Sequence, residues 1–167
     1  MSDTLTQEEK ITKIREFIKD IDFGMLTTIA ADGSLHSRPM SANKNVEFDG
    51  DLWFFTNAST LKVDEALSHH QVNVSFTQPK DQRYVSVAGT AELVRDKEKI
   101  KELWEPELKA WFPNGVDEPD IALLKVNAKS AEFWEGPSSF VAYAVGMVKA
   151  LATGEQYQGG QNGRVDF

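Results

Sequence analysis

Six short runs with apolar residues at alternating positions, most of them joined by tight turns, limit the fold of this chain more than any other feature. The first run, residues 23–30, ends at Ala31, Asp32 and Gly33, and Leu35 opens the next, as in a hairpin. Four more runs follow, at residues 51–57, 72–78, 83–94 and 123–136. Runs joined by such short links form antiparallel strands, and the first three are expected to be consecutive neighbours in a sheet.

Helical patterns are inserted between these runs and do not alternate with them. The first begins at a capping box of Thr6 and Glu9 and places apolar residues on one face as far as Ile21. Further helices are expected at residues 61–70, 96–104, 107–112 and 140–152. The last of these is apolar enough to pack against the body or a partner subunit.

This order argues against a doubly wound parallel sheet. It predicts a mainly β (α+β) fold, a six-stranded antiparallel β-barrel with flanking helices, because closing the sheet removes unpaired strand edges. Residues 1–153 are expected to form one domain, with residues 154–167 as a polar tail. The glycines at 159–163 lack the spacing of a dinucleotide-binding loop.

Charge and cysteine content exclude several classes of protein. There is no cysteine, which excludes thiol nucleophiles, disulfide scaffolds, and zinc or iron–sulfur frameworks built on thiolates. The formal net charge of −8 repels nucleic acid, and the lack of a signal sequence or long apolar run predicts a cytoplasmic protein without membrane contact. Any anionic ligand must therefore be held by a local group of basic residues.

Residues 56–70 offer such a place, because an aromatic strand runs there into a helix. Asn57, Ser59 and Thr60 can each cap the helix, and Lys62 in its first turn opposes the helix dipole. A phosphate bound by backbone amides, these hydroxyls and Lys62 would relieve that mismatch. The alternative is that Lys62 points into water on an ordinary capped helix.

Arg38 favours the phosphate hypothesis, because it lies in the run that precedes the aromatic strand. A neighbouring strand would bring its guanidinium to the same anion. Pro39 lacks an amide donor, which predicts an edge or bulged strand whose backbone can face a ligand.

From about residue 13 to residue 137, the chain resembles the pyridoxamine 5′-phosphate oxidase-like FMN-binding split barrels, in their bacterial general stress protein branch. Arg38 resembles the family arginine that holds the FMN phosphate. The segment FFTNASTLK (residues 54–62) resembles the family segment that packs on the flavin, and AEFWEG (residues 131–136) resembles a late strand of the family. The resemblance implies a six-stranded split barrel and a homodimer with two FMN molecules at the subunit interface, where Trp134 covers the FMN of the other subunit.

Departures from the family pattern bear on activity. Asn43 stands where true pyridoxamine 5′-phosphate oxidases have a lysine that binds substrate phosphate. Phe140, Ala142 and Ala144 stand in place of basic residues that contact substrate and flavin, and Tyr84 replaces a glutamine near the flavin. The chain is therefore not expected to be a true pyridoxamine phosphate oxidase.

The sequence thus predicts an FMN-binding flavoprotein, with no catalytic side chain assigned. The residues expected to line or bind the cofactor are Arg38, Pro39, Met40, Ser41, Phe55, Thr56, Asn57, Ser59, Thr60, Lys62, Tyr84 and Trp134. Two functions remain open, an FMN-dependent oxidoreductase and a non-catalytic flavin-binding or redox-sensing stress protein; haem is a third, less favoured ligand.

Other constellations of side chains give no further site. His36, His69 and His70 are not expected to bind a metal. Asp64 and Glu65 are expected to be solvated, and no Ser, His and acid arrangement is legible in the sequence.

Overall fold

In the part of the chain that the structure describes, the fold has seven strands and four α-helices. The computed structural model describes residues 5–43, 46–137 and 139–167. The α-helices are α1 (Gln7–Lys19), α2 (Leu61–His69), α3 (Lys97–Leu103) and α4 (Phe140–Thr153). The 3₁₀ helices are η1 (Pro79–Asp81), η2 (Pro106–Ala110) and η3 (Gly115–Asp117). The strands are β1 (Phe23–Ile29), β2 (Leu35–Ser41), β3 (Asp51–Asn57), β4 (Gln71–Gln78), β5 (Arg83–Val94), β6 (Ile121–Glu135) and β7 (Gln161–Asp166).

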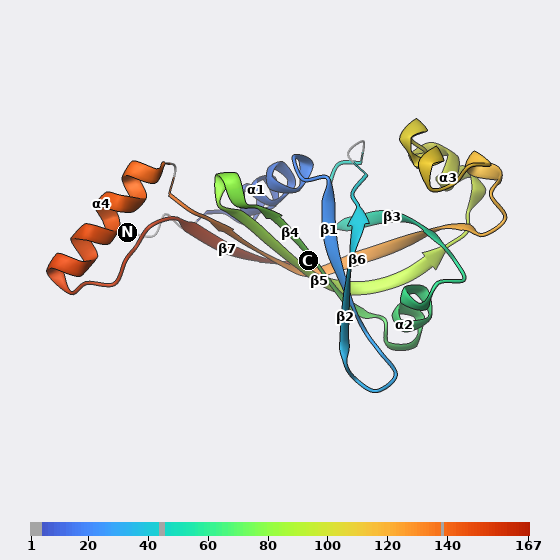
Figure 1. Cartoon of the computed structure of the whole chain (residues 1–167), viewed down its shortest axis with the longest axis horizontal. Helices are drawn as coiled ribbons and strands as arrows, with labels where there is room; N and C mark the ends of the chain where they lie inside the picture. Colours follow the sequence, from blue (N-terminus) through green and yellow to red (C-terminus); the bar gives the residue numbers. More distant parts are fainter. Residues whose placement is uncertain (1–4, 44–45, 138) are drawn as a thin grey trace.

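The strands form one antiparallel sheet that curls into a half-barrel (Figure 1). Its order is β2-β1-β4-β5-β6-β3, with β7 added beside β6. A bulge at Ala88 and Gly89 shifts the register between β5 and β6, and a Cβ at Gly89 would lie 2.2 Å from the Asn127 carbonyl oxygen. Bulges increase the local twist of a sheet, which favours such curling. The predicted mainly β split barrel with flanking helices is confirmed.

One prediction about the sheet is wrong, because β2 and β3 follow each other in the chain without pairing. β2 pairs with β1, where Pro39 lies opposite Met25, whereas β3 pairs with β6. One edge of β6 pairs with β5. Because β6 is 15 residues long, its other edge pairs with β3 at residues 121–127 and with β7 at residues 130–135. The alternation of apolar residues predicts which face of a strand is buried, but it does not predict which other strand pairs with it. β2 nevertheless ends the ladder, as Pro39 predicts for an edge strand.

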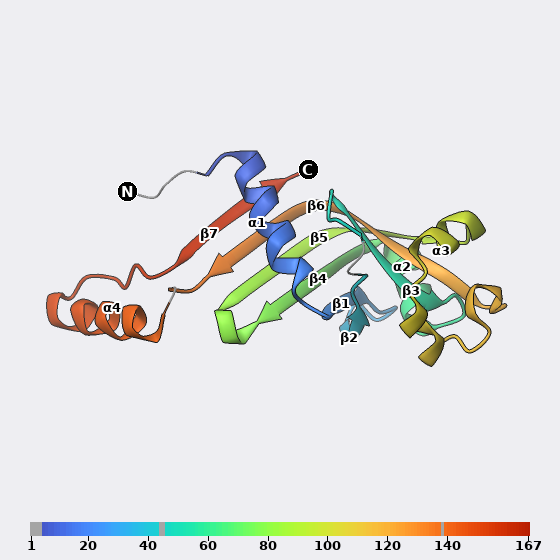
Figure 2. The same cartoon turned by 90° about the horizontal axis from the view of Figure 1, so that it is seen from above.

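The described residues form two apolar core clusters. The larger lies under α1, which crosses one face of the sheet (Figure 2), and packs the ring of Phe17 edge-on against Phe133 with centroids 5.9 Å apart. The capping box of Thr6 and Glu9 that starts α1 is confirmed. The smaller cluster packs α3 and η2 against β3 and β6. It forms one wall of the candidate site.

The C-terminal region differs from the expected polar tail. Residues 161–166 form β7, whose Val165 is buried opposite Ala131 of β6. α4 forms as predicted but has no buried residue, and it projects away from the body of the chain (Figures 1 and 2). Of the helices in the described residues, none combines the length and apolar character needed to cross a membrane.

Candidate functional site

A cavity of about 280 Å³ opens where β2 approaches the end of β3 and the start of α2. Residues 39–41 of β2, residues 55–57 of β3 and Lys62 of α2 line it. These seven positions are among those predicted from the sequence. The curl of the sheet, and not a shared ladder, brings the two strands together, since β2 and β3 end the strand order on opposite sides.

The apolar wall of the cavity comes from residues that sequence reasoning missed. Phe23 of β1 and Leu108, Trp111 and Phe112 at η2 complete the lining. Phe55 joins this wall to the smaller core cluster through an edge contact with Trp104, with ring centroids 5.8 Å apart. Aromatic and aliphatic walls with a few polar groups are typical of pockets for cofactors.

Lys62 is the basic residue that lines the cavity. Its side chain is partly buried, and burial lowers its pKa, with a further lowering from the positive charge of Arg38. Among the described residues, no carboxylate lies within ion-pair distance of the Lys62 ammonium group. Lys62 of α2 is therefore near the positive charge of Arg38 of β2 and has no carboxylate partner of its own among the described residues, so an anion beside Lys62 would be favoured.

Arg38 is held in place by a buried carboxylate that the sequence analysis assigned to solvent. Glu65 is only 6 % exposed, so the expectation for it was wrong. Its Oε2 accepts a hydrogen bond from Arg38 Nη2 at 3.0 Å and another from the hydroxyl of Thr28, which itself accepts from Arg38 Nη1. Two donors of the guanidinium are thus fixed, and the other N–H groups remain for a ligand.

The pKa of Glu65 is lowered, and the cause is its set of hydrogen bonds. The bond from Thr28 contributes most and outweighs the opposing effect of burial, while His36 and Arg38 add to the lowering. The Glu65 carboxylate is therefore ionised at neutral pH and forms the anionic centre of a small buried network.

His36 joins this network from the exposed side. Its Nδ1 lies 2.8 Å from Glu65 Oε1, and its Nε2 lies 3.4 Å from the Ser34 hydroxyl. Ser34, His36 and Glu65 thus form a spatial row of a hydroxyl, an imidazole and a carboxylate, which the amino-acid sequence did not predict. The Ser34 hydroxyl, however, donates to Asp32 Oδ1 at 2.5 Å, so its proton is directed away from the imidazole. This geometry does not activate Ser34 as a nucleophile.

The hydroxyls of Ser59 and Thr60 lie at the start of α2 but are engaged within the chain. Ser59 Oγ donates to Asp120 Oδ2 at 2.6 Å, and Thr60 Oγ1 donates to the carbonyl of Asn57 at 2.9 Å. Thr60 is the N-cap of α2, yet its side chain makes no capping hydrogen bond. In this arrangement, neither hydroxyl proton is directed at the cavity.

Tyr84 and Trp134 lie away from the cavity within one chain. They face each other across β5 and β6 and are 40 % and 41 % exposed. They border a separate groove beside Gln82 and Gly136. One chain therefore brings together the β2, β3 and α2 parts of the predicted site but not these two aromatic residues. Across the described residues, no three His, Asp or Glu side chains are grouped to hold a metal ion.

Comparisons with known proteins identify relatives of this chain. The model of the family described as pyridoxamine 5′-phosphate oxidase like matches residues 9–158. Protein bli-3 of Neurospora crassa is 27 % identical over 157 residues, which cover 89 % of this chain and 75 % of that protein. General stress protein 26 of Bacillus subtilis is 26 % identical over 127 residues, covering 73 % of this chain and 86 % of that protein.

A solved structure extends the comparison to the fold. The general stress FMN/FAD binding protein of the phytopathogen Xanthomonas citri superposes with a TM-score of 0.68 and is 29 % identical. The alignment covers 81 % of this chain and 94 % of that one. Because the family model spans all but the two ends of the sequence, the chain belongs to the pyridoxamine 5′-phosphate oxidase-like family.

Proposed function

We propose that the chain is an FMN-binding flavoprotein that acts as an FMN-dependent oxidoreductase on a small molecule. The observation that carries the proposal is an apolar cavity that Lys62 lines, with the positive charge of Arg38 close enough to lower the pKa of Lys62. A phosphate ester attached to a flat ring system matches both features, since the cations suit the phosphate and the aromatic wall suits the ring. The FMN/FAD binding protein of Xanthomonas citri supports the choice of a flavin.

In this proposal, Lys62 and the remaining N–H groups of Arg38 hold the phosphate. Residues 39–41 of β2 run beside the ring, and residues 55–57 cover it from β3. Thr60 contributes its backbone amide at the start of α2. The backbone amide and the hydroxyl of Ser59 reach the phosphate only after leaving Asp120, and the hydroxyl of Thr60 only after leaving the Asn57 carbonyl.

The residues of this chain orient the cofactor and control access to it. FMN, when bound, supplies electron exchange with small molecules. Lys62 is the one ionisable residue among those that line the cavity in the described part of the chain, so we assign no general acid or base.

We further propose a homodimer in which each subunit completes the site of the other. Pockets that enclose a drug-sized ligand have volumes of about 300–1,000 Å³, and the cavity in one chain lies just below that range. Tyr84 and Trp134 are half-exposed aromatic residues outside the cavity. Across a dimer interface, Trp134 would cover the FMN bound by the other chain.

Spectroscopy of the purified protein tests the proposal. We expect flavin absorbance, a released chromophore with the mass of FMN, and about one FMN per chain in a dimer. A haem-type Soret band or a colourless protein that does not bind added FMN would contradict it.

Stopped-flow mixing with NADH or NADPH then tests catalysis. Rapid bleaching followed by recovery with an oxidant supports an oxidoreductase, whereas no change over minutes indicates a non-catalytic flavin-binding or redox-sensing protein.

The FMN-loaded protein is expected to show no sustained turnover of pyridoxamine 5′-phosphate. Asn43, in place of the family lysine, donates to the carbonyl of Leu103 at 2.9 Å, and the segment containing Ala142 and Ala144 carries no basic side chain. Each lost hydrogen bond to a charged group removes about 1.5–3 kcal/mol, so two losses weaken substrate binding at least about 100-fold. Formation of pyridoxal 5′-phosphate measured by absorbance checks this. Steady product formation at micromolar substrate would contradict it.

A further inference from the structure

α4 presents an uncovered apolar face to its surroundings. Phe140 and Leu151 are 79 % and 80 % exposed, and Val141, Val145 and Val148 lie on the same side of the helix. At 100° per residue, these five side chains fall within one broad stripe. We call it the outer face of α4. Large apolar faces of this kind in a folded protein mark an interaction site.

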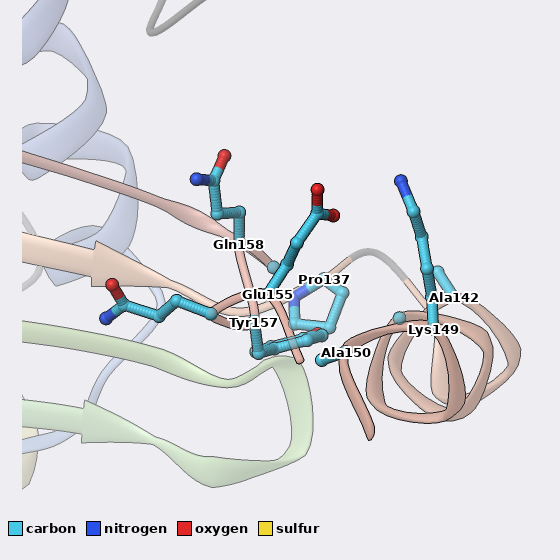
Figure 3. A pocket seen from close by; sticks show the side chains of 10 residues that line it. Pro137, Ala142, Lys149, Ala150, Glu155, Tyr157 and Gln158 are labelled. Atoms are coloured by element: carbon cyan, nitrogen blue, oxygen red, sulfur yellow. The ribbon is translucent and has the colours of Figure 1, made fainter. Parts of the chain in front are cut away.

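The opposite side of α4 is only loosely attached to the rest of the chain. A groove of about 690 Å³ separates it from residues 155–159, and Lys149, the one charged residue of the helix, lines that groove. Tyr157 lies between the helix and the body, beside Pro137 and Ala150 (Figure 3). The ring of Tyr157 packs edge-on against Tyr143 with centroids 5.7 Å apart. The helix is thus held to its own chain on one side, and its outer face is left for another molecule.

The position of α4 in the sequence limits where its outer face can act. Trp134 and the first residue of α4, Phe140, are six positions apart, and six residues span at most about 20 Å. If Trp134 covers the cavity of a partner subunit, α4 must start within that distance of the same cavity. The rim of the cavity exposes two large aromatic side chains, Phe23 and Trp111.

We propose that the outer face of α4 docks on a second copy of this chain, against the Phe23 and Trp111 rim of that copy's cavity. This proposal rests on the proposed function, because it takes Trp134 to lie over the partner's cofactor. In a twofold dimer the contact occurs twice, so each α4 closes the site of the other subunit. The site then gains an apolar wall without charge, which selects uncharged, apolar second substrates.

The area of the outer face of α4 is too small for a stable interface by itself, but it fits one part of a larger interface. A helix of 14 residues is about 21 Å long and about 10 Å across. One face therefore offers roughly 200 Å², about a quarter of the roughly 800 Å² that each partner buries in a standard interface. The outer face of α4 needs the sheet surface around Tyr84 and Trp134 beside it to form a stable dimer.

A membrane is a poorer occupant of the outer face. Helices that lie on membranes carry several Lys or Arg on the polar face, where α4 has Lys149 alone. The net charge of −8 also repels anionic lipid surfaces. A second copy requires neither basic residues nor a change of charge.

Cross-linking between single-cysteine variants tests the proposal, because the natural chain has no cysteine. Val148→Cys on the outer face is combined with Lys109→Cys, which lies on η2 two positions from Trp111. The two variants carry different affinity tags, are loaded with FMN, allowed to exchange subunits and treated with a short bismaleimide. Ala150→Cys, on the groove side of α4, replaces Val148→Cys in the matched control.

We expect Val148→Cys to form a covalent heterodimer with Lys109→Cys, and Ala150→Cys to form none. A monofunctional maleimide checks that the Ala150→Cys thiol is reactive. Equal cross-linking of both α4 variants, or cross-linking of Val148→Cys chiefly with itself, would overturn the proposal. So would flotation of the protein with phosphatidylcholine vesicles that Val148→Glu abolishes. A dimer that binds FMN but gives no heterodimer cross-link refutes the α4 contact alone. Failure to bind FMN refutes the proposed function by a separate measurement.

Discussion

A Lys62→Glu variant is expected to bind FMN at least about tenfold more weakly than the natural chain, a loss of about 1.4 kcal/mol. The ammonium group lines the cavity, and both burial and the nearby Arg38 charge lower its pKa. A bound phosphate removes this unfavourable situation by supplying negative charge between the two cations. A carboxylate in the same place repels the phosphate, and charges about 4 Å apart interact by about 4 kcal/mol near a protein surface. Fluorescence titration of flavin-free protein with FMN measures the change.

Charge reversal elsewhere provides the control for this experiment. Lys97→Glu makes the same change in net charge at an exposed position at the start of α3, outside the cavity. It should leave the FMN dissociation constant within about twofold, since exposed charges farther apart than the Debye length of about 10 Å are screened. Lys62→Gln should lie between the natural chain and Lys62→Glu. Equal FMN affinity in Lys62→Glu and Lys97→Glu would refute the assignment of Lys62 to the phosphate.

The parts of the fold that could be predicted are those set by local pattern. Alternating apolar residues identify the strand of residues 51–57, and Thr6 with Glu9 fixes the start of α1. The missing amide of Pro39 correctly predicts an edge strand. In each case the physical cause lies within a few residues of the feature, so the sequence contains it.

The parts that failed depend on contacts between distant residues. Glu65 follows Asp64 on a short helix and resembles an ordinary solvated acid, but its partner Thr28 is 37 residues away and Arg38 is 27 residues away. Trp111 reaches the cavity because η2 packs on β3, a contact that no local spacing indicates. The burial of Glu65 could have been predicted only by asking which carboxylate neutralises the charge of Arg38.

The candidate site likewise depends on the arrangement of distant segments. The prediction that Arg38 and Lys62 act together rested on neighbouring strands, and the strands are not neighbours. The two charges nevertheless interact, because the curled sheet brings its β2 edge to the start of α2. A barrel allows residues at opposite ends of the strand order to share a cavity.

Replacement of Glu65 by Gln is expected to destabilise the flavin-free protein by about 2–3 kcal/mol at pH 7. Breaking a buried ion pair costs about 3–5 kcal/mol, and we expect less here because Arg38 and His36 keep some contact with water. Gln retains the shape of Glu and can still accept one hydrogen bond, but it leaves the Arg38 guanidinium without a counter-charge. Urea unfolding measures the difference. Asp64→Asn, on the exposed side of the same helix, is the matched control and should change the stability by less than about 1 kcal/mol, which is the interaction of an exposed acid with the helix dipole in the first turn.

The pH dependence separates the charge of Glu65 from its packing. The pKa of Glu65 is lowered in the folded chain, mainly by the hydrogen bond from Thr28, so its carboxylate stabilises the fold above the unfolded pKa of about 4.3. That contribution is lost as the pH falls through the lower, folded pKa, where Glu65 becomes neutral like Gln. The gap in stability between the natural chain and Glu65→Gln should therefore be full at pH 7 and shrink below about pH 4. A gap that stays constant down to acid unfolding would mean that Glu65 acts through its shape, and the buried charge would then have no part in holding Arg38.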